Sequence, residues 1–353
     1  MSRLPVYILG GSGYGGGELL RLLSQHPKID AIRAVSRKQA GEPFWKSHPN
    51  LRGVVQGSFD GEPDWSALVG AEHPVVFSAM PHFELAQQLP TLEAVWKSAG
   101  LAEKLTLIDL SGDFRLDDAT SFERAYGKPH PYPQGLGKFV YGLPEWQRQK
   151  LVGAKRIASP GCFATAIQLA LLPFAGMKDL GFVAVSAATG SSGSGTSPGE
   201  GTHHPTRAQD YRAYKVLSHQ HEAEIIRLLD LEQTSGYSLG FVPHSAPMVR
   251  GIFATVQFRA KDLDAAAVSS RIEKAFKDTP FVNLLGNEPP RVGAVAGSNF
   301  CDVGWQVKGG TVAVMTAIDN LVKGMAGQAI QNMNLALGFI ETEGLLQPGT
   351  YPG

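Results

Sequence analysis

Short apolar runs alternate with segments of helical periodicity through the first 110 residues of the chain. The runs at 5–10 ("PVYILG"), 29–36, 73–81 and 104–111 predict strands, because each is short, apolar and bounded by turn residues. Leucines at 19, 20, 22 and 23 predict a helix that ends at Pro27, and another helix is expected within 82–99. This alternation predicts a parallel, doubly wound α/β sheet.

The pattern changes after residue 111. Residues 112–145 are rich in aromatic residues, proline and glycine and are only weakly periodic, so we expect a lid-like loop there. We expect helices from residue 162, near 220–230 and at 320–337, and a strand at 182–188. Alternating runs such as "GIFATVQFRA" predict a second, α+β domain with a mainly antiparallel sheet. We place the domains at 1–160, rejoined by 321–353, and at 161–320.

Composition excludes several classes of protein. The 32 basic residues balance the 32 acidic ones, which argues against a nucleic-acid or anionic-membrane binder. No run approaches eighteen apolar residues and the N-terminal apolar run is too short for a signal peptide, so we expect a cytoplasmic protein without a membrane span. Two distant cysteines form neither a disulfide framework nor a metal cluster.

A glycine-rich turn, "GGSGYGG", stands between the first predicted strand and the first helix. Its spacing fits the dinucleotide fingerprint of a Rossmann-type domain, in which glycines let the backbone approach a pyrophosphate at a helix N-terminus. An ordinary strand–helix turn is the alternative. The candidate cofactor-binding residues are Gly10, Gly11, Ser12, Gly13, Tyr14, Gly15 and Gly16.

The end of the second predicted strand refines the cofactor. NAD-binding domains usually place an acidic residue there for the ribose 2′-hydroxyl, whereas this chain has Ser36, Arg37 and Lys38. A hydroxyl and two cations suit a 2′-phosphate, so we expect NADP(H). A solvated basic turn is the alternative interpretation.

Cys162 follows Pro160 and Gly161 and precedes an apolar helix. The positive end of a helix dipole stabilises a thiolate there, although a cysteine in apolar surroundings also packs as a small hydrophobe. His219 and His221 open another predicted helix, where the dipole favours the neutral imidazole that a general base requires. We expect no metal, since no carboxylate spacing completes a familiar ligand set.

Two further segments carry candidate anion-binding groups. Arg115, in "SGDFRL", follows a predicted strand end and could hold a carboxylate or phosphate, or form a surface ion pair. The loop "GSSGSG" at 190–195, which includes Ser191, could form an anion-binding nest or a flexible linker.

Together these segments resemble the N-acetyl-γ-glutamyl-phosphate reductase family, including its lysine-pathway relatives. The resemblance covers residues 7–338 and is carried by "GGSGYGGGELLRLL", "SRKQAGEP", "HPNLRG", "LIDLSGDFRL", "FVYGLPE", "SPGCFATA", "TGSSGSG", "AYKVLSHQHEAEI" and "AIDNLVKGMAGQAIQNMNLALG". More distantly, the chain resembles aspartate-semialdehyde dehydrogenase, which has the same architecture and Cys/His chemistry.

The resemblance implies an enzyme that reduces an acyl phosphate to an aldehyde with NADPH. It implies that Cys162 is the nucleophile, that His219 is the acid/base and that Glu224 positions the site. It also implies that Arg115 and Tyr214 lie near the substrate and that Asn320 and Gly324 lie by the cofactor. A homodimer or homotetramer is implied as well.

Two substrates stay open. We expect N-acetyl-γ-glutamyl phosphate, reduced to N-acetyl-glutamate 5-semialdehyde in arginine biosynthesis. However, "HHPTR", with His203 and Arg207, resembles the lysine-pathway branch, whose substrate is 2-aminoadipate 6-phosphate linked to the small acidic carrier protein LysW. Two more distant hypotheses are aspartate-semialdehyde dehydrogenase activity and a non-catalytic NADP-binding protein.

Overall fold

The computed structural model describes residues 4–177, 180–230, 238–260 and 263–352. The chain forms two compact units, one of residues 1–160 and 325–346 and the other of residues 161–324 and 347–353. The sequence-based division placed all of 321–353 with the first domain, whereas in the structure residues 321–324 and 347–353 group with the second unit.

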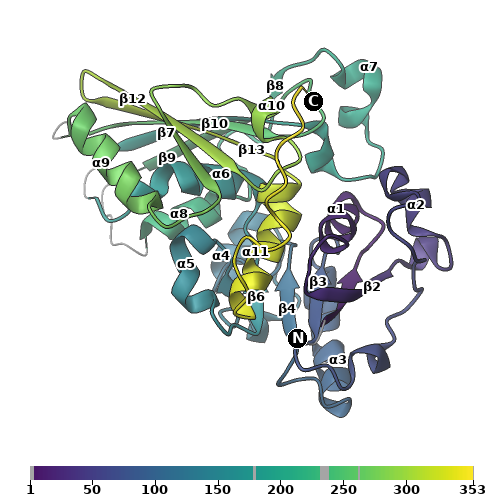
Figure 1. The fold of residues 1–353 in the computed structure, drawn as a ribbon. Helices are drawn as coiled ribbons and strands as arrows, with labels where there is room; N and C mark the ends of the chain where they lie inside the picture. The colour runs from purple at the N-terminus through teal and green to yellow at the C-terminus, as the bar shows by residue number, and fades with distance from the viewer. Residues whose placement is uncertain (1–3, 178–179, 231–237, 261–262, 353) are drawn as a thin grey trace. The chain divides into compact units, whose positions relative to one another are not determined.

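The first unit is built on a parallel six-stranded sheet in the order β2-β1-β3-β4-β6-β5 (Figure 1). Strands β1 (Leu4–Leu9), β3 (Val75–Ser78) and β4 (Thr106–Asp109) are almost wholly buried, which explains their continuous apolar sequences. The remaining strands are β2 (Ile29–Val35), β5 (Val140–Tyr141) and β6 (Arg156–Ala158). The predicted doubly wound parallel sheet is therefore confirmed.

Helices from both ends of the chain complete this unit. Helices α1 (Tyr14–Leu23), α3 (Glu84–Ser98) and α5 (Pro144–Leu151) come from the N-terminal segment. Helix α11 (Gly327–Ala336) returns from the C-terminal part and packs on α1, α5 and β4. Every residue of α11 is buried, so this late segment completes the first core.

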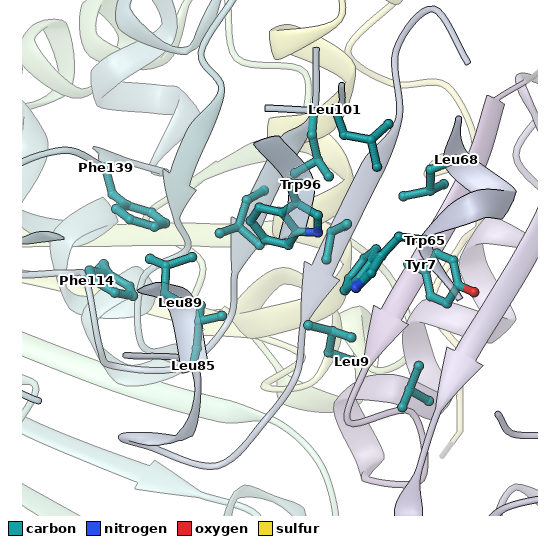
Figure 2. Close-up of a cluster of buried hydrophobic side chains, with 14 of the residues drawn as sticks. Tyr7, Leu9, Trp65, Leu68, Leu85, Leu89, Trp96, Leu101, Phe114 and Phe139 are labelled. Atoms are coloured by element: carbon teal, nitrogen blue, oxygen red, sulfur yellow. The ribbon is translucent and has the colours of Figure 1, made fainter. Parts of the chain in front are cut away.

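The core of the first unit includes an aromatic cluster, drawn in Figure 2. Trp65 contacts Trp96 edge-to-face with ring centroids 5.4 Å apart, and Phe114 stacks on Phe139 at 4.2 Å. The Tyr7 hydroxyl donates to the Asp64 carbonyl at 2.8 Å, so its polar end is satisfied at the edge of the cluster.

The expectation of a loop at 112–145 is wrong in part. The segment contains helix α4 (Ala119–Tyr126), strand β5 and the first residues of α5. The Asp118 side chain caps α4, and Gly127 ends it with φ +71°. Phe122 is the one buried residue of α4, and the helix is only eight residues long and mostly polar, so it was not recognised among the surrounding proline and glycine residues.

The second unit is built on a mixed sheet in the order β11-β12-β13-β10-β7-β9-β8. The strands are β7 (Phe182–Thr189), β8 (Arg212–Ala213), β9 (Ser238–Ser245), β10 (Ile252–Arg259), β11 (Val282–Gly286), β12 (Cys301–Lys308) and β13 (Thr311–Ile318). Two of the six pairings, β7–β9 and β11–β12, are parallel and the others antiparallel, which confirms the mainly antiparallel sheet.

Helices pack on this sheet. Helix α6 (Cys162–Leu171) contacts β10, β13 and α8 (Glu222–Asp230), while α9 (Ala265–Phe276) contacts β11 and β12 (Figure 1). Every residue of α6 after Cys162 is buried, in agreement with its strongly apolar sequence. Three short helices lie in connecting segments: α2 (Phe44–Ser47) in the first unit, and α7 (His204–Arg207) and α10 (Val292–Val295) in the second. Among the described residues, no helix is long and apolar enough to cross a membrane.

Candidate active site

The glycine-rich turn joins β1 to α1 in the first unit, as the sequence indicated. Gly10 has φ +77°, and a Cβ there would lie 2.6 Å from the Ala79 carbonyl oxygen. A Cβ at Gly16 would lie 2.4 Å from the Gly11 oxygen. Both positions therefore require glycine, and the close approach keeps the turn tight. Gly13 is the N-cap of α1 and makes no side-chain hydrogen bond to the first-turn N–H groups, which is the arrangement that a phosphate-binding helix N-terminus needs.

The basic turn after β2 lies beside this loop. The Ser36 hydroxyl is 2.8 Å from the Ser12 hydroxyl, which ties the strand end to the glycine turn. Arg37 and Lys38 are exposed, and Arg37 pairs with the equally exposed Glu62 at 2.9 Å. An exposed pair contributes little free energy, so the guanidinium can turn to a phosphate. A hydroxyl and two mobile cations without an acid at the strand end fit the 2′-phosphate of NADP(H).

Cys162 is the first residue of α6 in the second unit, with Gly161 as its N-cap. A Cβ at Gly161 would lie 2.4 Å from the His221 ring, and a Cβ at Gly324 would lie 2.7 Å from the Cys162 Cβ. Glycine is thus required on two sides of the cysteine. The helix N-terminus places partial positive charge at the thiol, which favours its thiolate form.

Glu224 holds the turn before Cys162. Its carboxylate, 1% exposed, accepts the Gly161 N–H at 2.9 Å, and its carbonyl accepts from Gln168 of α6 at 2.7 Å. The second carboxylate oxygen is 4.0 Å from Nε2 of His221. Glu224 therefore joins α8 to the start of α6 and to one of the two histidines.

His219 is buried in a nest of rings. Its ring meets those of His221, Phe163 and Phe241 edge-to-face at centroid distances of 4.6, 5.4 and 5.5 Å. Burial, and then the positive charge of Lys215, lower the pKa of His219 to about 4, so the ring is neutral at pH 7. Nδ1 accepts the His221 N–H at 3.2 Å, which leaves the proton of the neutral ring on Nε2.

Tyr214 extends this cluster. Its ring lies 5.9 Å from that of His219, and burial followed by the nearby Cys162 raises the pKa of its phenol. The phenol of Tyr214 is therefore protonated, and Tyr214 lies close enough to Cys162 for the two side chains to interact electrostatically. Lys215 and Leu217, between Tyr214 and His219, have φ of 44° and 53°. Such strained backbone at non-glycine residues often occurs at functional sites.

The serine–glycine loop is held by backbone and by Asn320. The N–H groups of Gly190, Ser191 and Ser192 donate to carbonyls of the 248–251 segment, which removes them from an anion-binding nest. Asn320 donates to the Ser192 hydroxyl at 3.0 Å and accepts the Gly251 N–H at 2.7 Å. These contacts favour a positioning role for Asn320 in the second unit.

Of the other three predicted substrate-binding residues, one is exposed and two are buried. His203 is exposed at the start of α7, whereas Arg207 is buried and donates to the Ser245 hydroxyl and to the Thr189 and Ala246 carbonyls. Arg115, in the first unit, is also buried and donates to the Ser159 carbonyl at 2.7 Å and the Leu110 carbonyl at 2.9 Å. These hydrogen bonds to backbone carbonyls favour a structural role for both arginines.

Sequence reasoning missed Asp319. This buried carboxylate pairs with Arg250 at 2.9 Å and accepts the N–H groups of Gly297, Leu321 and Val322. It anchors the turn that leads to Gly324, but an aspartate at a strand end gives no signal of such a role. No cluster of three or more His, Cys, Asp or Glu side chains fit for a metal occurs within the described residues.

Comparison with known proteins shows the family to which this chain belongs. A family profile described as semialdehyde dehydrogenase, NAD binding domain, matches residues 5–154, and one described as semialdehyde dehydrogenase, dimerisation domain, matches residues 162–320. N-acetyl-γ-glutamyl-phosphate reductase of Methanopyrus kandleri is 41% identical, with 98% of this chain and 99% of that protein covered. The chain belongs to the N-acetyl-γ-glutamyl-phosphate reductase family.

A second reductase is similar in sequence, and a solved structure is similar in fold. The [LysW]-L-2-aminoadipate 6-phosphate reductase of Deinococcus radiodurans is 39% identical, with 98% of both chains covered. Aspartate semialdehyde dehydrogenase II of Vibrio cholerae has the same fold, with a TM-score of 0.66 at 16% identity, covering 95% of this chain and 98% of that one. Membership in the family confirms the resemblance on which the sequence analysis relied.

Proposed function

We propose that this protein reduces N-acetyl-γ-glutamyl phosphate to N-acetyl-glutamate 5-semialdehyde and phosphate with NADPH. The observation that carries the proposal is Cys162 at the first residue of α6, among His219, His221 and Glu224. The fingerprint loop and the basic turn after β2 would bind the pyrophosphate and the 2′-phosphate of the cofactor. Bound NADPH supplies the hydride that turns the thioester into the aldehyde.

Covalent catalysis by Cys162 divides the reaction into two steps, formation of a thioester and its reduction. The thiolate attacks the acyl carbon, a C–S bond forms, and the C–O bond to the phosphate breaks with its electron pair leaving on phosphate. After reduction the C–S bond breaks and the thiolate is regenerated. The Cys162 N–H at the helix start can stabilise the oxyanion in both halves.

The tautomer of His219 determines which of its ring nitrogens can donate a hydrogen bond. Because Nδ1 of His219 accepts the His221 N–H, Nε2 carries the one proton of the neutral ring and can donate a hydrogen bond to the oxyanion or to the departing phosphate. The resting tautomer therefore supports a hydrogen-bonding role for the expected acid/base residue His219, and the proton that the phosphate takes up comes from solvent. Glu224 is a positioning residue, since it holds Gly161 rather than the reacting atoms.

Among the remaining candidates, Tyr214 lies by Cys162 and is the best-supported substrate contact. Arg115 and Arg207 already donate to backbone carbonyls, so we assign them to the support of the Ser159 and Thr189 segments. Ser191 and the exposed His203 remain candidate substrate-binding residues.

The alternative substrate is 2-aminoadipate 6-phosphate linked to a carrier protein. The Deinococcus relative favours it, because its identity is only two percentage points below that of the Methanopyrus reductase. We further propose that the second unit forms a homodimer, which the description of its family profile supports. Light scattering on the purified protein tests this, and a monomer would contradict it.

A reverse assay tests the function. The enzyme is given NADP and phosphate with N-acetylglutamate semialdehyde, aspartate semialdehyde or carrier-linked aminoadipate semialdehyde, and NADPH formation is followed. Cys162→Ser should lose turnover and keep NADPH binding. Cys301→Ala is the matched control, because Cys301 is the other cysteine and lies buried in β12. Turnover by Cys162→Ser at the native rate would overturn the mechanism, and NADPH binding without turnover on any substrate would favour a non-catalytic protein.

A further inference from the structure

The segment "HPNLRG" places a buried histidine against the glycine turn, and the proposed mechanism does not use it. His48 ends the short helix α2 and is 6% exposed. Its Nε2 lies 2.8 Å from the Gly11 carbonyl oxygen. Because a carbonyl only accepts, Nε2 must carry the proton and donate it. Helices α1 and α2 lie beside each other in the first unit (Figure 1).

The His48 ring also packs on the first turn of α1. A Cβ at Gly17 would lie 2.5 Å from Nδ1 of the ring, so glycine at 17 is what lets the ring approach. Phe59 closes the other side: its ring contacts His48 edge-to-face at 6.1 Å and would lie 3.2 Å from a Cβ at Gly11. The histidine therefore bridges the loop at Gly11 and the helix at Gly17.

Peptide geometry links this bridge to the ligand. The C=O of Gly11 and the N–H of Ser12 belong to one planar trans peptide and point in opposite directions. A donor that holds the Gly11 oxygen on one side therefore directs the Ser12 N–H to the other side. In a fingerprint loop such N–H groups receive the pyrophosphate.

We propose that His48 is a positioning residue for the cofactor, which fixes the Gly11–Ser12 peptide so that its N–H faces the pyrophosphate. This inference rests on the proposed binding of NADPH. It acts on the pyrophosphate, which NADPH and NADH share, and not on the 2′-phosphate contact proposed for Arg37.

Two variants separate the donor from the volume of the ring. His48→Phe keeps an aromatic ring and removes the donor, while His48→Gln places an amide N–H near the position of Nε2. We expect His48→Phe to raise the Kd of NADPH, followed by the fluorescence of the bound nicotinamide, by about 10-fold, the value of one buried hydrogen bond. His48→Gln should stay within about 3-fold of the native Kd, and kcat at saturating NADPH should stay within about 2-fold in both.

Two further measurements, the Kd of NADH and the variant Gly17→Ala, extend the test. The Kd of NADH should rise by the same factor as that of NADPH, whereas a change confined to NADPH would overturn the inference. Gly17→Ala should reproduce the rise in Kd, because its Cβ displaces the ring, and should remain informative if His48→Phe does not fold. In the double variant, Gly17→Ala with His48→Phe, the two effects should not add.

Unchanged Kd in His48→Phe, or equal loss in His48→Phe and His48→Gln, would show that the donor has no such role. These outcomes are distinct from failure of the proposed function, in which the native protein itself would bind no NADPH.

Discussion

The buried neutral His219 predicts a specific loss of stability in acid. The perturbation is His219→Gln, which removes the titrating ring and keeps an amide oxygen for the His221 N–H. The pKa of His219 is lowered to about 4 in the folded chain, against 6.5 for an ordinary histidine. Since the unfolded chain binds the proton more readily, the contribution of His219 is fully present above pH 6.5 and is lost as the pH falls toward 4.

The magnitude follows from the two pKa values. Linkage gives a loss of about 2 kcal/mol by pH 5 and about 3 kcal/mol by pH 4, relative to pH 7.5. The buried His26, His48 and His130 also have a lowered pKa, because burial disfavours their charged forms. They are present in both proteins, so their contribution cancels in the difference between native chain and variant.

The assay is the melting temperature of both proteins at pH 7.5, 6 and 5. A change of about 2 kcal/mol corresponds to roughly 4–8 °C for a unit of this size, so the variant should gain that much on the native chain between pH 7.5 and 5. His204→Gln, at an exposed histidine, is the matched control and should show no such gain. A difference between native and His219→Gln that stays constant within about 1 °C would refute the assignment of a buried, neutral ring.

Further substitutions test the geometry of the two units. Gly161→Ala places a Cβ 2.4 Å from the His221 ring, so we expect kcat to fall by about 100-fold with NADPH binding unchanged, measured by steady-state kinetics; native kcat would contradict the packing. Glu224→Leu removes the acceptor of the Gly161 N–H, and we expect kcat to fall by about 10-fold, whereas Glu224→Gln, whose amide oxygen can still accept, should stay within about 3-fold; equal loss in the two variants would remove the positioning role. Ser36→Asp places an acid at the end of β2, and the ratio of KM for NADH to KM for NADPH should fall at least about 10-fold; a constant ratio would locate the 2′-phosphate elsewhere. Gly16→Ala should abolish detectable NADPH binding by titration, because its Cβ would meet the Gly11 oxygen at 2.4 Å, and native affinity would contradict the tight turn.

Local patterns were sufficient wherever the backbone itself carries the signal. The glycine turn, the strands around it and the helix that starts at Cys162 were predicted because the apolar periodicity, the glycines and the Pro-Gly break all lie within a few residues of the feature. The helix at 119–126 was missed because it is short and mostly polar and lies in a segment rich in proline and glycine.

Side-chain partners far apart in sequence were decided only by the tertiary structure. The sequence pointed to Arg115 and the serine–glycine loop as anion-binding groups, but it could not show that backbone carbonyls from other segments already engage them. Nor could it place His48 on Gly11 or the Glu224 carboxylate on the Gly161 N–H, 37 and 63 positions away. Sequence alone determined which residues have the chemistry for a reductase of this family; packing decided which of them are buried, neutral or occupied, because burial and hydrogen bonding depend on neighbours that only the folded chain brings together.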